Sequence, residues 1–297
     1  MSETRWVIVG AAGRVGAGLL MALDGRPVRP WTRNDADLTD RDSVLATLAA
    51  IRAESAGAII CVNAAAVADV DGAQLDPGTA DLVNAQAPGW LAQGLGPGDL
   101  LVHLSTDYVF GGGVFGGVGP DEVRSPYDEG APTAPQSVYG RTKRDGENAV
   151  LVVRPDSYVV RTSWVFDSAR PNFATLFRDR ILAGDRVEAV TDQVSRPTAT
   201  ADLVAGLLAL VDRRPDPGIY HCTNSGQASR YDVACAIAAE LKADPALVAG
   251  IRTAQAPPRP AVRPAYSVLG LRRWVGAGLP EPRSWRPALA EFLRPAP

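Results

Sequence analysis

Two side chains with acid–base capacity, Tyr139 and Lys143, stand four residues apart in this sequence. The chain has seven tyrosines and two lysines in 297 residues, so chance alone would give about 0.05 pairs with this spacing. On a helix, residues i and i+4 share a face, which would place the phenol beside the ammonium. A neighbouring positive charge lowers the pKa of a phenol, so Tyr139 could act as a general acid towards a carbonyl oxygen during reduction. The alternative is an ordinary exposed helix pair.

A hydroxyl group is expected close to this pair. Thr106 follows the apolar run 100–104, and the carboxyl ends of parallel strands face the ligand crevice. Its hydroxyl could therefore hydrogen-bond the same carbonyl oxygen, although a helix cap or a turn would equally use a threonine. Asp107 is interpreted as an orienting or turn residue, and His103 as a buried core histidine. His221 is expected to end a strand of a second lobe.

A glycine-rich turn follows the first apolar run, 6–9. Gly10, Gly13 and Gly16 permit a tight turn and close approach of the backbone to a pyrophosphate, while the start of the next helix offers N–H groups to the anion. The G-x-x-G-x-x-G spacing is a weak signal by itself, because any glycine-rich strand-to-helix turn could produce it. Its place at the first such turn favours a dinucleotide site.

The residues after the second strand bear on the choice of cofactor. An NAD site usually offers an acidic residue to the ribose, whereas Arg33 stands here. Arg33, together with Arg14, favours the 2′-phosphate of NADPH, with NADH as the alternative and a solvated surface role for Arg33 as another. The expected cofactor-binding residues are Gly10, Gly13, Arg14, Val15, Gly16, Arg33, Asp37, Leu38, Asn63, Ala64, Ala65, Ala66, Ser105, Tyr139 and Lys143.

The elements that must position these residues alternate along the chain. Strands are predicted at 6–9, 58–62, 100–104 and 158–160, and helices at 15–23, 42–51, 80–92 and 137–150. This rhythm predicts an α/β fold with a doubly wound parallel (Rossmann) sheet. Helices at 173–182, 201–211 and 231–241 predict a smaller C-terminal lobe. We therefore expect residues 1–165 to bind the dinucleotide and residues 166–297 mainly to bind substrate, with segments returning to the first domain.

Composition excludes several function classes. Apolar residues make up 46% of the chain and the net charge is −3, which argues against nucleic-acid and polybasic membrane partners. Three cysteines without a C-x-x-C pair and two histidines predict neither a metal site nor a disulfide framework. No apolar run approaches the ~18 residues of a membrane span. A cytoplasmic protein is expected, with a mobile glycine-rich loop at 111–117 and an irregular proline-rich segment at 256–264.

Taken together, these residues resemble the extended short-chain dehydrogenase/reductases, and within them the dTDP-4-dehydrorhamnose reductase family. The likeness covers nearly the whole chain. Its most specific strings are Ser105-Thr106-Asp107-Tyr108-Val109-Phe110, Tyr139-Gly140-Arg141-Thr142-Lys143 and Arg161-Thr162-Ser163-Trp164-Val165-Phe166. The resemblance implies that Thr106, Tyr139 and Lys143 are the catalytic residues. It also offers Asp107, Trp164, Asn172, Arg196 and Arg263 as candidates for holding the sugar or its nucleotide.

The resemblance implies reduction, by NADPH, of the C4 ketone of a dTDP-6-deoxy-4-ketohexose. The first choice of substrate is dTDP-4-dehydro-L-rhamnose, which would give dTDP-L-rhamnose. Val67-Ala68 stands where the family usually has Tyr-Thr, and the loop after Phe110 is longer, so a 4-ketoreductase for another activated deoxysugar is an alternative. A non-catalytic NADP-binding regulatory subunit and a nucleotide-sugar epimerase are further alternatives. A homodimer is expected, and a need for magnesium in its assembly is left open.

Overall fold

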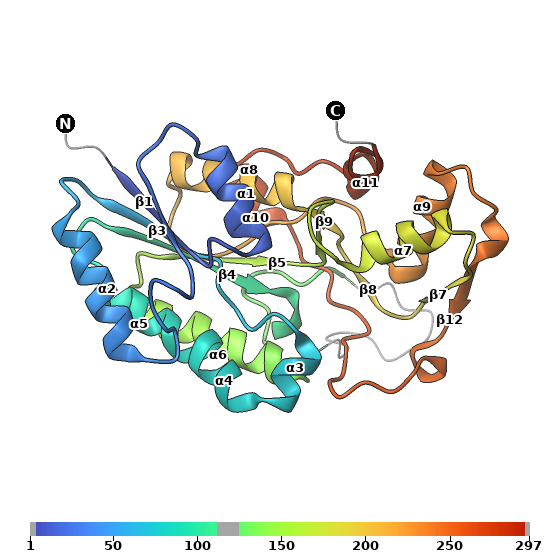
Figure 1. The fold of residues 1–297 in the computed structure, drawn as a ribbon, viewed down its shortest axis with the longest axis horizontal. Helices are drawn as coiled ribbons and strands as arrows, with labels where there is room; N and C mark the ends of the chain where they lie inside the picture. Colours follow the sequence, from blue (N-terminus) through green and yellow to red (C-terminus); the bar gives the residue numbers. More distant parts are fainter. Residues whose placement is uncertain (1–3, 112–124, 295–297) are drawn as a thin grey trace.

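A six-stranded parallel sheet forms the centre of the molecule, described here by a computed structural model covering residues 4–111 and 125–294. Its strand order is β10-β5-β4-β3-β1-β2, and every neighbouring pair is parallel. The strands are β1 (Arg5–Val9), β2 (Val28–Trp31), β3 (Ile59–Asn63), β4 (Leu100–Thr106), β5 (Tyr158–Thr162) and β10 (Gly218–His221). The predicted doubly wound α/β fold is confirmed (Figure 1).

Helices cover both faces of this sheet (Figure 1). One face carries α1 (Arg14–Ala22), α8 (Thr200–Arg213) and α10 (Arg272–Gly276), and the other α2 (Arg41–Ala53), α5 (Ala87–Gly94) and α6 (Val138–Val153). Successive side chains of β1 point to opposite faces of the sheet, so Ile8 packs with the first set of helices and Val7 with the second. Burial on both faces explains why the strands read as continuous apolar runs.

The segment predicted as one helix at 80–92 is divided into three pieces. These are α4 (Pro77–Asp81), a π-helical turn η1 (Leu82–Gln86) and α5, preceded by the short helix α3 (Val70–Leu75). Pro88 has no N–H to donate to the carbonyl of Asn84, which accounts for the wider turn at this point. The bend brings Asn84 against α6, where its amide donates to the hydroxyl of Thr142.

The second lobe has an apolar core of its own, which includes Phe177, Ile181, Val233 and Ile237. Its helices are α7 (Phe173–Leu182), α9 (Arg230–Glu240) and α11 (Trp285–Leu293). Its strand pairs are β6 (Val165–Phe166) with β9 (Thr198–Ala199), β7 (Val187–Val190) with β12 (Val248–Ile251), and β8 (Val194–Ser195) with β11 (Ala228–Ser229). Three 3-10 turns complete the described elements, η2 (Asp107–Val109), η3 (Pro245–Leu247) and η4 (Thr253–Gln255).

His221 corrects one expectation. Its strand, β10, lies in the central sheet beside β5 rather than in the second lobe, so a segment after residue 166 does return to the sheet. The domain boundary near residue 165 stays a prediction. Beyond Gly111, the glycine-rich loop predicted at 111–117 lies outside the described residues. Within 4–111 and 125–294, none of the helices combines the length and the apolar character that a membrane crossing requires.

Candidate active site

The glycine turn between β1 and α1 packs directly against the end of β3. Gly10 has a φ of +79°, and a Cβ there would lie 2.6 Å from the backbone nitrogen of Ala65. A Cβ on Gly16 would lie 2.3 Å from the carbonyl oxygen of Gly10. Only glycine fits these two positions without a shift of backbone. The turn is therefore as tight as the predicted dinucleotide site requires.

The start of α1 is suited to an anion. Gly13 is its N-cap, and among the described residues no side chain caps the helix and no acidic residue stands in its first turn. The N–H groups of Val15 and Gly16, at the start of the helix, therefore lack the usual side-chain acceptor. Ala64 and Ala66 beside the turn are small and half-buried, and Asn63 is buried. These features fit a dinucleotide pyrophosphate at this edge of the sheet.

The residues expected to bind the adenosine end lie beyond β2. Arg33 is exposed and has no ion-pair partner in the described part of the chain. Asp37 is also exposed and accepts hydrogen bonds from the backbone and hydroxyl of Thr39, which hold the pKa of its carboxyl below the ordinary value. Leu38 is half-buried against the core under α2. Arg33 therefore remains accessible to a 2′-phosphate.

Arg14 differs from Arg33. Its guanidinium donates to the carbonyl of Pro171 at 3.0 Å and lies 3.1 Å from a carboxylate oxygen of Asp167. Both partners belong to the segment after β6, so Arg14 joins α1 to the second lobe. The expectation that Arg14 helps to hold the 2′-phosphate is not supported by this geometry.

The three predicted catalytic residues come together where β4 ends beside α6. The hydroxyl of Thr106 lies close to the phenol of Tyr139, whose ring lies edge-on to that of Tyr108 at 5.8 Å between ring centres. One turn further along α6, Nζ of Lys143 donates to the carbonyl of Leu104 at 2.6 Å. The i and i+4 spacing does place both side chains towards the end of β4, as the sequence predicts.

The electrostatics of the pair differ from the expectation. Burial raises the pKa of Tyr139, and the neighbouring hydroxyl of Thr106 only partly offsets this shift. Burial lowers the pKa of Lys143 to about 8, opposed by the charge of Glu147. The prediction that the ammonium acidifies the phenol is therefore wrong for the protein chain itself, because the amine is turned to the Leu104 carbonyl and is poorly solvated.

Asp107 has a structural rather than a substrate-facing position. Its side chain is buried and accepts hydrogen bonds from the hydroxyls of Ser195 (2.8 Å), Ser267 and Thr106 (3.1 Å). Burial raises the pKa of Asp107 to about 6, and these three hydrogen bonds oppose the shift. Because both carboxylate oxygens accept hydrogen bonds from within the chain, the expected substrate contact of Asp107 is not supported by this geometry. The residue instead fixes the hydroxyl of Thr106 and connects β4 to the second lobe.

Ser105 also turns away from the crevice. Its hydroxyl donates to Glu147 on α6, and Glu147 in turn receives two hydrogen bonds from Arg161 on β5, at 2.8 and 2.6 Å. All three side chains are buried. The Ser105 hydroxyl therefore belongs to a buried ion-pair network that holds α6 against the sheet, and the expected cofactor contact of Ser105 stays a prediction.

Three of the expected substrate residues have partners within the chain or are enclosed by it. Asn172 caps α7, and its amide makes four hydrogen bonds, to Asp167, Arg170, Ala174 and Thr175, which exhausts its capacity. Arg263 forms a two-pronged ion pair with Asp71 of α3, at 2.9 and 2.8 Å. Arg196 is partly buried with Nε lacking a partner among the described residues, and this burial lowers its pKa. Of the three, Arg196 retains unused hydrogen-bonding capacity.

Sequence reasoning missed Arg230, the first residue of α9. Its guanidinium lies 3.6 Å from the ring centre of Trp164 and 3.9 Å from that of Phe173. Nη1 is buried without a hydrogen-bond partner among the described residues, and burial lowers the pKa of Arg230 to about 10. Asp107 and Tyr108 lie close enough to oppose that shift. Nothing in the sequence around Arg230 marks it, because its neighbours form an ordinary helix cap.

Trp164 supports this stack from an unusual backbone conformation. Its φ is +44°, in the left-handed region that non-glycine residues rarely adopt. Strain of this kind persists only where the surroundings hold it, and it concentrates at functional sites.

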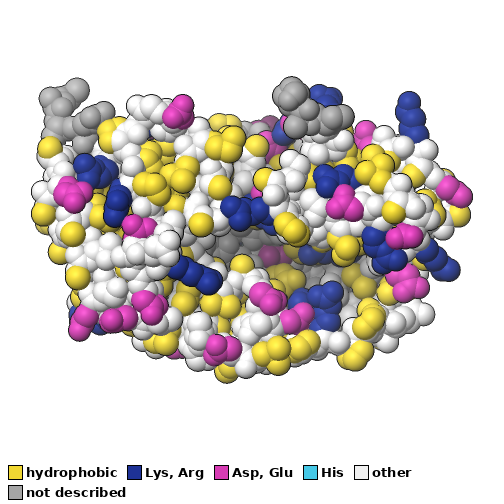
Figure 2. Space-filling model, in the orientation of Figure 1, with side chains coloured by type: hydrophobic (Ala, Val, Ile, Leu, Met, Phe, Trp, Pro, Cys, Tyr) yellow, Lys and Arg dark blue, Asp and Glu magenta, His cyan; other side chains and the backbone are white. Residues whose placement is uncertain are grey.

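The face of the molecule shown in Figure 2 has a recess across its middle, with Lys and Arg side chains along the edges of the recess.

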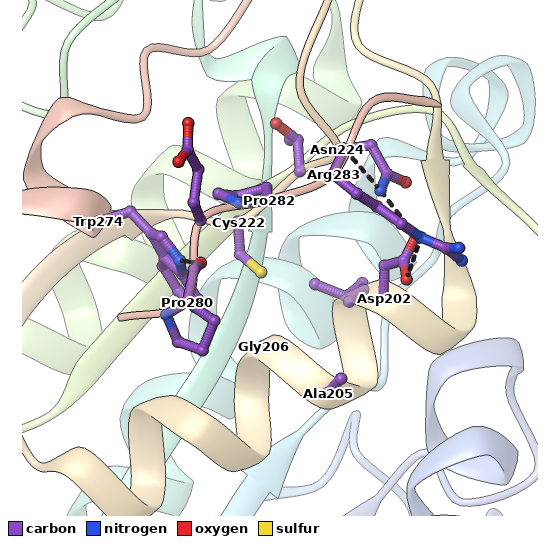
Figure 3. Close-up of a pocket in the computed structure, with 12 residues that line it drawn as sticks. Asp202, Ala205, Gly206, Cys222, Asn224, Trp274, Pro280, Pro282 and Arg283 are labelled. Atoms are coloured by element: carbon purple, nitrogen blue, oxygen red, sulfur yellow. Dashed lines mark hydrogen bonds and ion pairs between the residues drawn. The ribbon is translucent and has the colours of Figure 1, made fainter. Parts of the chain in front are cut away.

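A separate cavity of about 250 Å³ lies between α8, the residues that follow β10 and the segment 280–283 (Figure 3). Cys222 and Trp274 line its apolar part, while Arg283 and Asp202 form an ion pair at 2.9 Å on its other side. Burial raises the pKa of the Cys222 thiol to about 12, so it has little thiolate character. None of the predicted catalytic residues lines this cavity.

Comparison with known proteins supports the family resemblance. A family profile described as RmlD substrate binding domain matches residues 4–296. A Streptomyces antibioticus protein named probable dTDP-4,6-dihydroxy-2-methyloxan-3-one 4-ketoreductase is 44% identical over 97% of this chain and 94% of its own length. A Mycolicibacterium smegmatis dTDP-4-dehydrorhamnose reductase is 42% identical over 97% of this chain and 85% of its own.

Solved structures support the same family resemblance. The dTDP-4-dehydrorhamnose reductase of Bacillus anthracis, in complex with NADP, superposes with a TM-score of 0.87 at 28% identity, covering 98% of this chain and 99% of the other. The orthologue from Clostridium acetobutylicum gives 0.86 at 32% identity, over 97% and 98%. The resemblance predicted from the sequence is confirmed: this chain belongs to the RmlD substrate-binding-domain family of short-chain reductases.

Proposed function

We propose that this protein is an NADPH-dependent sugar-nucleotide 4-ketoreductase, acting on the C4 ketone of a dTDP-6-deoxy-4-ketohexose. The observation that carries the proposal is the meeting of Thr106, Tyr139 and Lys143 at the end of β4, on the same carboxyl edge of the parallel sheet as the glycine turn, in a chain of this family. The first choice of substrate is dTDP-4-dehydro-L-rhamnose, which would be reduced to dTDP-L-rhamnose. The named activities of the relatives support this choice.

Different residues of the chain would bind the cofactor, donate the proton and orient the donor. The glycine turn and the start of α1 would hold the pyrophosphate of NADPH, and Arg33 its 2′-phosphate. NADPH supplies the hydride for the carbonyl carbon. Tyr139 would give its proton to the carbonyl oxygen, so that the ketone becomes an alcohol. Thr106 would orient the phenol, because its oxygen lies between Tyr139 and Asp107.

The second lobe would hold the nucleotide part of the substrate. Arg230 and Arg196 both carry buried guanidinium nitrogens without partners among the described residues, and a diphosphate offers the acceptors that such donors need. Trp164 presents an apolar ring surface beside Arg230. Binding energy from the nucleotide would hold the ketone in place, so proximity supplies much of the rate.

The test is oxidation of NADPH by wild-type protein and by Tyr139→Phe and Lys143→Ala. Both changes should lower turnover by orders of magnitude while NADPH still binds, and Lys242→Ala, which removes the other, exposed lysine, should change neither. Undiminished turnover in Tyr139→Phe would remove the proposed acid. Silence of the wild type with every ketosugar nucleotide would favour a non-catalytic regulatory subunit, and tightly retained NAD would favour an epimerase.

A second substrate has its own support. The Streptomyces antibioticus relative is named as a 4-ketoreductase for a different dTDP-linked ketosugar, and Val67-Ala68 departs from the pattern usual in the rhamnose enzymes. Comparing kcat/KM for dTDP-4-dehydro-L-rhamnose with that for other dTDP-linked 4-ketosugars decides between the two. A cytoplasmic location and a homodimer stay predictions.

A further inference from the structure

Three buried polar side chains form a line behind the predicted catalytic tyrosine. Asn63 ends β3, His103 lies beside it on β4, and Lys143 reaches them from α6; their exposed fractions are 1%, 0% and 2%. Nδ2 of Asn63 lies 3.1 Å from Nδ1 of His103, and Nε2 of His103 lies 3.4 Å from Nζ of Lys143. The imidazole therefore bridges the end of the cofactor crevice and the lysine.

The orientation of Asn63 is fixed by the backbone. The N–H of Ala65 donates to Oδ1 of Asn63 at 3.1 Å, so the amide nitrogen must be the atom that faces His103. An amide NH₂ group can only donate a hydrogen bond. Nδ1 of His103 must therefore accept, which leaves the imidazole proton on Nε2.

His103 is held neutral. Its burial lowers its pKa well below the ordinary value, and the charge of Lys143 acts in the same direction. A neutral imidazole has one N–H, and in this arrangement that N–H points towards Nζ of Lys143. An ammonium has no lone pair with which to accept it, whereas a neutral amine has one.

We propose that His103 is a positioning residue for Lys143. His103 donates its Nε2–H to Nζ of Lys143 and so favours the neutral amine, while Nζ itself donates to the carbonyl of Leu104. This inference rests on the proposed function, in which Lys143 belongs to the catalytic set. Burial lowers the pKa of Lys143 to about 8 from the ordinary 10.5, so this lysine can gain or lose a proton near working pH, and the Nε2–H of His103 would act in the same direction as burial.

Other ionisable groups around α6 are engaged elsewhere or act against this effect. Glu147, one turn along the same helix, raises the pKa of Lys143 and is itself held by Arg161. Asp107 and Tyr108 of η2 act on Tyr139. On the packed helices α3 and α4, Asp71 and Asp81 are bound to Arg263 and Gln86, respectively, and the segments η1 and α5 contain no ionisable side chain.

The first experiment reads the proton position directly. The chain has two histidines, so ¹⁵N NMR of histidine-labelled protein, recorded without cofactor or sugar and above pH 8, where Lys143 is neutral, gives two sets of ring signals. His221 is an internal control, because its Nδ1 lies 3.0 Å from the carbonyl of Gly270, which can only accept. We expect opposite tautomers, Nε2–H for His103 and Nδ1–H for His221, with His221→Gln to assign them. An Nδ1–H or charged His103 would overturn the proposal.

The second experiment follows the lysine. The chain also has two lysines, so a pH titration of labelled lysine signals separates Lys143 from the exposed Lys242, which Lys242→Arg assigns. His103→Gln keeps an N–H directed at Nζ and should leave the Lys143 midpoint near 8. His103→Leu removes that donor but keeps the site buried, so the midpoint should rise above that of the wild type and stay below 10.5.

An unchanged Lys143 midpoint in His103→Leu would refute the role of His103, even if the ketoreductase activity were established. Should that variant fail to fold, the tautomer of His103 in the wild type still decides. A protein without ketoreductase activity, but with the expected tautomers and titration, would instead remove the proposed function and leave the proton arrangement intact.

Discussion

Asp107 offers a quantitative test of the buried network that joins β4 to the second lobe. Its pKa is raised to about 6 from 3.8, so the folded protein retains a proton that the unfolded chain releases between these values. Stability from this group is therefore present at low pH and is lost as the pH rises through about 6. The difference corresponds to about 3 kcal/mol in total, of which about 2 kcal/mol falls between pH 4.5 and 7.5.

The perturbation is Asp107→Asn, which removes the titration but keeps the shape. The assay is urea denaturation of wild type and variant across pH 4.5 to 7.5, expressed as the difference in unfolding free energy. Asparagine cannot accept all three hydroxyl hydrogen bonds with the strength of a carboxylate, so a constant offset is expected. On top of it, the variant should gain about 2 kcal/mol relative to wild type as the pH rises through this window.

Asp71→Asn is the matched control. Arg263 holds the pKa of Asp71 below its ordinary value, so the stability from that carboxylate is lost only as the pH falls below about 4. Its difference from wild type should be constant between pH 4.5 and 7.5. A constant difference for Asp107→Asn as well, or one that falls with rising pH, would refute the account of Asp107 as a buried, costly carboxylate.

Two further changes test the binding surfaces. Gly16→Ala places a Cβ 2.3 Å from the Gly10 carbonyl oxygen, so NADPH affinity measured by fluorescence should fall by at least tenfold. The control is Gly276→Ala, which should leave NADPH affinity unchanged because its Cβ meets no described atom within 4 Å. Arg230→Gln should raise the inhibition constant of dTDP roughly 10- to 100-fold, the value of one or two charge-assisted hydrogen bonds, without affecting NADPH. The control is Arg286→Gln, another arginine stacked on a tryptophan, but on α11; equal effects of the two arginine changes would contradict a site at Arg230.

The local patterns of the sequence determined the fold and named the candidates for the catalytic set. Short continuous apolar runs, alternating with segments of helical spacing, predict the sheet and most of its helices, since both depend on which faces of an element meet the core. The glycine turn was recognisable because a backbone that passes within contact distance of Ala65 leaves no room for a side chain. Tyr139 and Lys143 were recognisable because their spacing is a property of the helix alone.

Only the tertiary structure decided which polar groups are free to act. Asp107 and Ser105 have side chains suited to a ligand, yet partners from distant segments occupy them. Arg230 was hidden for the same reason, because a missing partner becomes visible only when every neighbour is in place. The proton on His103 depends on a chain of hydrogen bonds from Ala65 through Asn63. Hydrogen bonds and burial are relations between segments far apart in the chain, which a local pattern of residues cannot encode.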